Sequence, residues 1–232
     1  MTAHDAPVQV RELTDLLIAT SSFEDYVQQI VELAAVRVAP GASCGLTMRI
    51  DGKTRTVAAS GDLASQVDEI QYGTGMGPCL ESMETGTVVT VTDMLQEDRW
   101  GDYRVHAIEH GVRSSLSLPI AGRGQLASGA LNLYFTTPGA FDAGQVQRGM
   151  HFADQCSGAL QLATRLAEQA TLTAQMWEAM ESRSVIDQAI GIVMAQNRCD
   201  AATAFGVLRT ASQNRNVKLR IVAADIVRAL TG

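Results

Sequence analysis

Residues 159–190 read ALQLATRLAEQATLTAQMWEAMESRSVIDQAI, and this stretch decides how the chain is organised. It contains neither glycine nor proline, and residues with high helix propensity dominate it. We therefore expect one long helix. The chain has 232 residues, which exceeds the roughly 100 to 200 residues of a single domain. The helix is accordingly expected to join a first domain at residues 1–158, through a helical linker at 159–175, to a second domain at 176–232.

A stripe of apolar and small residues follows this helix at alternating spacings of four and three. Its members are Phe152, Cys156, Ala159, Ala163, Leu166, Ala170, Thr173, Trp177 and Met180. Such spacing is typical of a coiled coil and predicts a parallel homodimer through the long helix. The alternative is that the stripe packs against the sheet of its own domain, because its many alanine and threonine residues would make a weak dimer seam.

The residues before the long helix predict a mixed domain. Two helical periodicities fill residues 8–38, with a break at 19–22. Runs of β-prone residues then alternate with helical patches near 79–85 and 103–110; the runs are 44–50, 54–60, 87–91, 114–120 and 129–135. Asp51-Gly52 predicts a hairpin turn, and the glycine-containing residues 121–126 predict a loop between the last two runs. The fold class is therefore α+β, with an antiparallel sheet flanked by helices.

After the long helix, the pattern predicts a three-helix bundle. Turns are expected at 196–200 and 213–216, and Asp200 is suited to cap the second helix. The apolar positions expected to form its core are Ile186, Ala189, Val193, Met194, Ala204, Phe205, Leu208, Ala211, Leu219, Val222, Ala223, Ile226, Val227 and Leu230.

Charge is distributed unevenly along the chain. The net charge of −7 would normally disfavour nucleic acid. Between residues 197 and 220, however, Asp200 is the only acidic residue beside five basic ones. We call these five the basic cluster: Arg198, Arg209, Arg215, Lys218 and Arg220. Such a local excess of positive charge is typical of a polyanion-binding surface, although a solvated helix face would show the same pattern.

Residues 182–194, SRSVIDQAIGIVM, begin a resemblance that covers about 55 residues. It continues at Ala204-Phe205, Leu208-Arg209, Ser212, Asn214, Lys218-Leu219 and Ala223. In these positions the C-terminal part is similar to the ANTAR family of RNA-binding antitermination modules. One departure is Ile190, where many members carry lysine.

RNA hairpin loops are the partner that this resemblance implies. Arginine can pair with phosphate and stack on unpaired bases, and amide side chains can read base edges. The expected RNA-binding residues are therefore the basic cluster together with Arg183, Gln188 and Asn214.

The first 160 residues resemble a GAF domain, which is a sensory α+β module. The segments that carry the resemblance are 73–80, 88–93, Arg99-Trp100, 111–119 and 129–135. GAF domains bind diverse small ligands or none, so the resemblance implies a sensory and dimerising role, and the identity and binding residues of any small-molecule ligand are unknown. The signature of cyclic-nucleotide binders and a bilin-attachment cysteine are both missing, and no cofactor is expected.

Other motifs are interpreted as structural. His106, Glu109 and His110 fit the zinc motif H-x-x-E-H, but a third metal ligand is lacking, so no metal is expected. The run Gly73-x-Gly75-x-Gly77 predicts a tight loop before a helix. Cys79 could start a helix and have a lowered thiol pKa, but a buried apolar role is favoured. The scattered cysteines Cys44, Cys79, Cys156 and Cys199 are expected to be reduced.

The function expected from these features is binding rather than catalysis. Neither a secretion signal nor a membrane span is apparent, which predicts a cytoplasmic protein. We expect a signal-responsive regulator that binds stem-loops in nascent transcripts and controls transcription termination. The alternative is a DNA-binding transcription factor with a GAF sensory domain, because three short helices can contain a helix-turn-helix.

Overall fold

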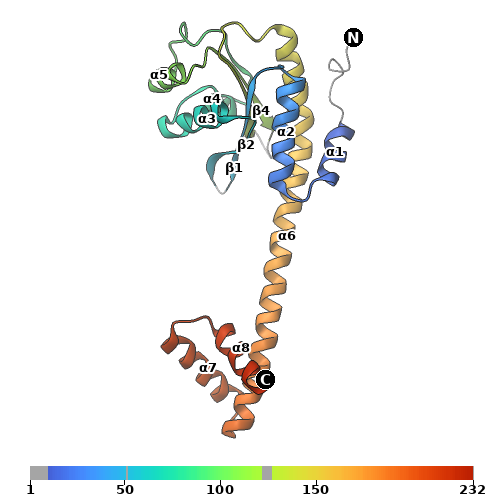
Figure 1. The fold of residues 1–232 in the computed structure, drawn as a ribbon, viewed down its shortest axis with the longest axis vertical. Helices are drawn as coiled ribbons and strands as arrows, with labels where there is room; N and C mark the ends of the chain where they lie inside the picture. Colours follow the sequence, from blue (N-terminus) through green and yellow to red (C-terminus); the bar gives the residue numbers. More distant parts are fainter. Residues whose placement is uncertain (1–9, 51, 122–126, 232) are drawn as a thin grey trace. The chain divides into compact units, whose positions relative to one another are not determined.

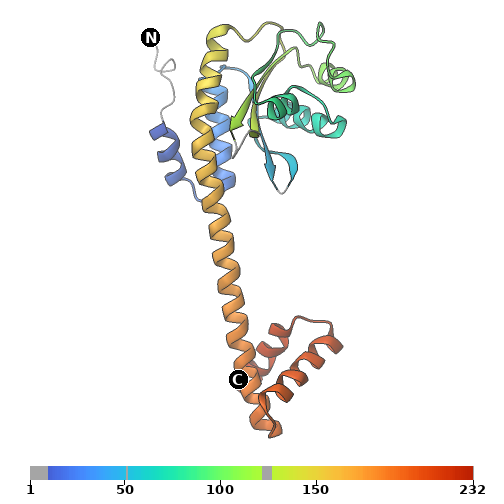
Figure 2. The ribbon, with the colours of Figure 1, turned by 180° about the vertical axis from the view of Figure 1, so that it is seen from behind.

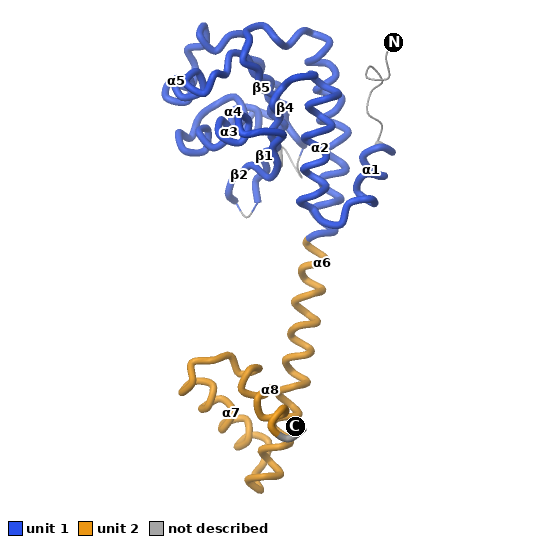
Figure 3. The backbone as a smooth tube through the Cα atoms, in the orientation of Figure 1, with its two compact units in different colours: residues 1–167 blue, residues 168–232 orange. Residues whose placement is uncertain are grey.

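The computed structural model describes residues 10–50, 52–121 and 127–231. It divides into two compact units, residues 1–167 and 168–232 (Figure 3). Helix α6, Ala143–Asn197, contributes residues to both.

Among the described residues of the first unit, five strands form a central antiparallel sheet. Its strands are β1 Ser43–Ile50, β2 Lys53–Ala59, β3 Val89–Val91, β4 Ser114–Ala121 and β5 Ala127–Phe135. They lie in the order β2-β1-β5-β4-β3. The predicted α+β class and the five β-prone runs are thus confirmed. In the first expected turn, Gly52 has a φ of +75°, whereas Asp51 lies outside the described residues. Of the loop expected at 121–126, Ala121 ends β4 and residues 122–126 lie outside the described ones.

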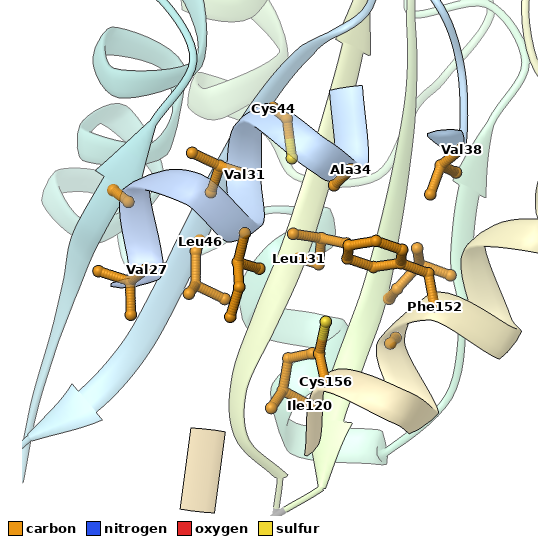
Figure 4. Close-up of a cluster of buried hydrophobic side chains, with 14 of the residues drawn as sticks. Val27, Val31, Ala34, Val38, Cys44, Leu46, Ile120, Leu131, Phe152 and Cys156 are labelled. Atoms are coloured by element: carbon orange, nitrogen blue, oxygen red, sulfur yellow. The ribbon is translucent and has the colours of Figure 1, made fainter. Parts of the chain in front are cut away.

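One face of the sheet is covered by α2 and the first part of α6, with α1 beside α2 (Figures 1 and 2). Helix α1 spans Val10–Ala19 and α2 spans Phe23–Arg37, as the periodicity predicted. The Ser22 hydroxyl caps α2 by accepting the Asp25 N–H at 3.0 Å. Side chains from α2, α6 and the strands interdigitate in the main core (Figure 4); those labelled there are Val27, Val31, Ala34, Val38, Cys44, Leu46, Ile120, Leu131, Phe152 and Cys156.

Helix α6 starts before the stretch that predicted it. Asp142 and Gln145 cap each other, since the Gln145 N–H donates to Asp142 Oδ1 at 2.7 Å and the Asp142 N–H donates to Gln145 Oε1 at 2.8 Å. This reciprocal capping lets the helix begin at Ala143 and include Gly144, Gly149 and Gly158, which propensity alone would place in a loop.

The four-three stripe on α6 divides into two parts. Phe152, Cys156 and Ala163 are buried in the first unit's own core, so the intramolecular alternative is correct for this part. From Leu166 onward the stripe is exposed: the exposed fraction is 50% at Leu166, 63% at Trp177 and 61% at Met180.

The opposite face of the sheet carries α3, α4 and α5 (Figures 1 and 2). Their bounds are Asp62–Thr74, Pro78–Thr85 and Gly101–Glu109. The patches near 79–85 and 103–110 predicted α4 and α5, but α3 was missed. Its buried side includes Asp68 and Gln71 beside Ala64 and Val67, so no apolar stripe marks it in the sequence.

The second unit is a three-helix arrangement of the end of α6 with α7, Ala201–Arg215, and α8, Leu219–Thr231. Asp200 caps α7 as predicted, because its Oδ1 accepts the Thr203 N–H at 2.8 Å. The fully or nearly fully buried core consists of Ala189, Val193, Ala204, Leu208, Val222 and Ala223.

The prediction that Phe205 belongs to this core is wrong. Ala204 and Leu208 face the core from α7, and Phe205, the residue after Ala204, lies at the edge of that face and is 40% exposed. The side chain of Leu230 lies outside the described ones. None of the described helices combines the length and the hydrophobicity that crossing a membrane requires.

Candidate nucleic-acid interface

The basic cluster divides according to whether its charges are already paired. Arg215 donates to Asp225 Oδ2 at 2.9 Å, and Arg220 is ion-paired with Glu178. On α6, Arg183 lies 3.9 Å from Asp187 Oδ2, with both side chains largely exposed. An exposed pair of this kind contributes little to stability and can exchange its partner for a phosphate at little cost.

Three members of the basic cluster have no ion pair with any other described residue. These are Arg198, Arg209 and Lys218, and all three are exposed. We call them the free cations. They come from the α6–α7 turn, the exposed side of α7 and the α7–α8 turn. Without internal partners, their full charge is available to a polyanion.

Arg198 occupies a backbone conformation that is unusual for arginine. Helix α6 ends at Asn197, and Arg198 has a φ of +52°, in the left-handed region. The following residue, Cys199, donates its N–H to Met194 O at 3.4 Å and so closes the helix end. Glycine is the usual residue at such a position because any Cβ is strained there. Strain of this kind is concentrated at functional sites.

Lys218 precedes the first turn of α8. Its carbonyl accepts the Ile221 N–H at 2.9 Å, and no acidic residue lies in that first turn. A cation at a helix N-terminus opposes the helix dipole, whereas an anion there is stabilised by the dipole and by free N–H groups. Lys218 and the start of α8 therefore attract negative charge together. The preceding turn contains Asn216 in the left-handed conformation, and Asn214 is exposed beside it.

Gln188 and Ile190 of α6 differ in their exposure to solvent. Gln188 is exposed, as reading a base edge requires. Ile190, which replaces the lysine common in the resembling family, is partly buried against the three-helix core. At this position the chain therefore gains an apolar contact and loses a cation.

A pocket of about 530 Å³ lies between α6 and α8 of the second unit. Its charged lining residues are Glu178, Glu181, Arg220 and Arg228. Because Arg220 pairs with Glu178 and Arg228 pairs with Asp225, the pocket has little positive charge to offer a phosphate. The free cations are better suited to that task.

The first unit holds a buried polar group of residues that the sequence did not reveal. Asp68 is fully buried, and its Oδ1 accepts three hydrogen bonds: from Tyr134 Oη at 2.5 Å, Asn132 Nδ2 at 3.0 Å and Gln71 Nε2 at 3.3 Å. We call Asp68, Gln71, Asn132 and Tyr134 the Asp68 cluster. Burial raises the pKa of Asp68 to about 7, although the hydrogen bonds from Tyr134 and Asn132 oppose this rise.

Several buried side-chain oxygens, two from this cluster and three from α5 and β4, have no hydrogen-bond partner within the described part of the chain. They are Asp68 Oδ2, Asn132 Oδ1, Tyr103 Oη, Ser115 Oγ and Ser117 Oγ. Buried polar atoms usually have hydrogen-bond partners, so this group of unpartnered oxygens is unusual. Single polar residues carry no periodic signal, which explains why sequence patterns missed them.

Gly75 and Gly77 lie in the tight connection between α3 and α4 that was predicted, whereas Gly73 lies in the last turn of α3. Gly75 has a φ of +70° and Gly77 one of +147°, and a Cβ at Gly77 would lie 2.3 Å from Gln71 Oε1. Gln71 Oε1 accepts the Cys79 N–H at 2.8 Å, which ties the start of α4 to the Asp68 cluster. Cys79 is fully buried, as its structural interpretation predicted, and this burial raises the pKa of its thiol to about 12.

The H-x-x-E-H motif of α5 and the four cysteines show no sign of metal binding or disulfide formation in the described residues. His106 Nδ1 lies 3.0 Å from Glu109 Oε2, and His110 Nδ1 lies 2.8 Å from the His106 carbonyl, all on the exposed end of α5. Among the described residues, no three histidine, cysteine or acidic side chains converge as a metal site would need. All four cysteines are unpaired thiols.

Comparisons with protein-family models find two matches. The model of the GAF domain matches residues 20–161, and that of the ANTAR domain matches residues 174–227. No curated protein matches the sequence.

Solved structures resemble the first unit. The GAF domain from a phosphoenolpyruvate-protein phosphotransferase of Coxiella burnetii is 19% identical, with a TM-score of 0.53, over 68% of this chain and 94% of that one. The corresponding domain from Acinetobacter is 15% identical, with a TM-score of 0.52, over 67% and 92%. A free methionine-R-sulfoxide reductase from Neisseria meningitidis, in complex with its substrate, is 13% identical, with a TM-score of 0.52, over 68% and 89%. At these identities the likeness shows the fold.

Proposed function

The chain belongs to the GAF domain family and carries an ANTAR domain after the GAF domain, and from this premise we propose that it binds stem-loops in nascent transcripts and controls transcription termination. An ANTAR domain is an RNA-binding antitermination module, and a GAF domain is a sensory one. Binding is the whole activity in this proposal, with no catalytic step. Its place of action is the cytoplasm, where it would meet the transcripts.

The observation that carries the proposal is the set of free cations. Arg198, Arg209 and Lys218 are exposed and without internal ion pairs in the described part of an otherwise acidic chain. Two of them occupy positions that lower the stability of the fold, namely a left-handed arginine and a lysine at a helix N-terminus. Contact with RNA phosphates gives both residues a function that offsets this cost.

Dimerisation is the second part of the proposal. The exposed stripe of Leu166, Trp177 and Met180 has heptad spacing and remains uncovered within each unit. A second copy of the same helix would bury it as a coiled coil. Two linked ANTAR domains would then hold two neighbouring loops at a raised effective concentration.

The sensory part of the proposal concerns the face of the sheet under α3, α4 and α5. The unpartnered oxygens around Asp68 would be satisfied by a small polar ligand of the GAF domain. Because Gln71 joins Asp68 to the start of α4, a change in the hydrogen bonds of Asp68 would reach that helix.

A competition experiment on the full chain tests the proposal. The protein first selects an RNA hairpin from a library with a fixed stem and a randomised loop. The selected hairpin is then labelled, and its binding is measured in competition with unlabelled hairpin or with duplex DNA. We expect the hairpin to compete and the duplex DNA to compete only weakly at physiological salt. Duplex DNA that displaces the hairpin at equal concentration would favour a DNA-binding transcription factor instead.

A further inference from the structure

Phe205 is the only aromatic residue after Trp177, and it lies on the surface of the ANTAR domain. The core of the domain is complete without its ring, since Ala204 and Leu208 are both fully buried and supply the packing face of α7. The residue remains 40% exposed. The aromatic side chain of Phe205 is therefore partly open to solvent, and α7 and α8 carry no other aromatic residue.

The surroundings of Phe205 on α7 are cationic. Arg209 follows it by one helical turn, which places the two side chains on the same side of the helix, with Cβ atoms about 5–6 Å apart. Arg209 is one of the free cations, so its guanidinium is not held by an internal carboxylate in the described residues. An exposed ring beside an unpaired guanidinium matches two parts of a nucleotide, the flat base and the phosphate.

The next residue, Gly206, leaves the helix backbone open beside the ring. A Cβ added at Gly206 would meet nothing within 4 Å, so the fold itself does not require glycine there. Glycine inside a helix is less favourable than alanine. An open backbone at this point allows another molecule to approach α7 closely.

The other exposed apolar residue of α7 lies elsewhere on its surface. Val207 is 45% exposed but follows Phe205 by two positions, which turns it about 200° around the helix. Phe205 and Val207 therefore do not form a continuous apolar patch of the kind that docks a protein. A single ring with a neighbouring cation fits a single base better.

We propose that Phe205 is a stacking site for one unpaired nucleobase in the RNA loop, with Arg209 pairing with a neighbouring phosphate. This inference rests on the proposed function, because it needs the ANTAR domain to bind a hairpin. It adds a base-contacting residue outside the basic cluster. Stacking is tolerant of base identity, so Phe205 supplies affinity for an unstacked base while polar side chains provide the sequence preference.

The test is a double-mutant cycle across the interface, made with the full chain and the hairpin recovered from the loop library. Phe205→Ala, Phe205→Leu and Phe205→Tyr are each measured against the intact hairpin and against hairpins with one abasic site at each loop position in turn. Val207→Ala is the matched control, since it removes an equally exposed apolar side chain from the same helix. Circular dichroism and light scattering monitor the fold and mass of every variant.

We expect Phe205→Ala to weaken binding about 5- to 150-fold, with Phe205→Leu close to it. Phe205→Tyr and Val207→Ala should bind like the parent. At one loop position, the abasic site should cost little further affinity once Phe205 is alanine.

Three results would overturn the inference while leaving hairpin binding intact. In the first, Phe205→Leu binds like the parent. In the second, the loss of binding free energy from the abasic site adds in full to that of Phe205→Ala at every loop position. In the third, Phe205→Ala changes the mass of the protein, which would place the ring in a protein interface. If the library yields no hairpin at all, the proposed function fails first and the stacking site fails with it.

Discussion

Replacing Arg198 by glycine should make the protein more stable and a weaker RNA binder. Arg198 has a φ of +52°, and a left-handed conformation costs an L-residue about 1–2 kcal/mol. Glycine removes this strain but loses about 0.4–1 kcal/mol through the greater freedom of the unfolded chain. The net gain in the free energy of unfolding is therefore on the order of 0.5–1 kcal/mol, which corresponds to roughly 2–8 °C in the Tm of a domain of this size.

The RNA side of the same change follows from counterion release. A contact to a single-stranded phosphate contributes about 0.7 to the slope of log affinity against log salt. Losing one contact should make the slope shallower by about that amount per ANTAR domain and weaken binding about fourfold near 0.15 M salt. Filter binding across a salt series measures both quantities, and thermal unfolding followed by circular dichroism measures Tm.

Two controls separate charge from strain. Arg198→Ala removes the charge but keeps a Cβ in the left-handed position, so it should weaken RNA binding without raising Tm. Asn216→Gly removes a left-handed Cβ at the end of α7 without changing charge, so it should leave RNA affinity unchanged. The reasoning is refuted if Arg198→Gly lowers Tm, or if it binds the hairpin with unchanged affinity and salt slope.

Three further predictions concern the rest of the chain. The pKa of Asp68 is about 7 in the fold against 3.8 as its ordinary value, so the native state keeps a proton that the unfolded state releases, and stability falls as pH rises through this window. This fall in the free energy of unfolding should be on the order of 4 kcal/mol, and Asp68→Asn should remove it. Urea unfolding at pH 4 and pH 8 measures it, and the same pH dependence in the variant would contradict the prediction. Leu166→Glu with Trp177→Glu should lower the mass seen by light scattering from a dimer towards the 24.7 kDa monomer, and a parent already monomeric at all concentrations would end the dimer hypothesis. Residues 1–160 alone should show no RNA affinity in filter binding, since the acidic residues concentrate there; binding as tight as that of the whole chain would contradict this.

Periodic features of the fold could be predicted from the sequence, and those without a period could not. The helices of residues 8–38, the long helix and the tail each show an apolar repeat, and the strands are rich in β-prone residues. Helix α3 was missed because it turns Asp68 and Gln71 inward. Phe205 was assigned to the core because hydrophobicity alone does not separate a core position from its neighbour on the flank.

The candidate site shows the same division. Local charge pointed to the basic cluster, but only tertiary structure shows that Asp225 and Glu178 already pair with Arg215 and Arg220. The left-handed backbone of Arg198 was equally invisible, because the residue usual at such a helix end is glycine. The stripe on α6 is continuous in sequence, and its division between a buried and an exposed part depends on where the sheet ends.

The most direct test of the central claim is the hairpin affinity of a triple variant in which Arg198, Arg209 and Lys218 are all replaced by glutamine. Its matched control replaces Arg49, Lys53 and Arg55, which are exposed in or beside the β1–β2 hairpin of the GAF domain, and so changes the net charge equally. Three lost phosphate contacts should reduce the salt slope by about 2 per ANTAR domain and weaken binding by well over tenfold near 0.15 M salt, while the control binds like the parent. If both triple variants lose affinity alike, overall charge governs binding and the free cations are not the RNA interface. Unchanged affinity in the folded triple variant would contradict the account outright.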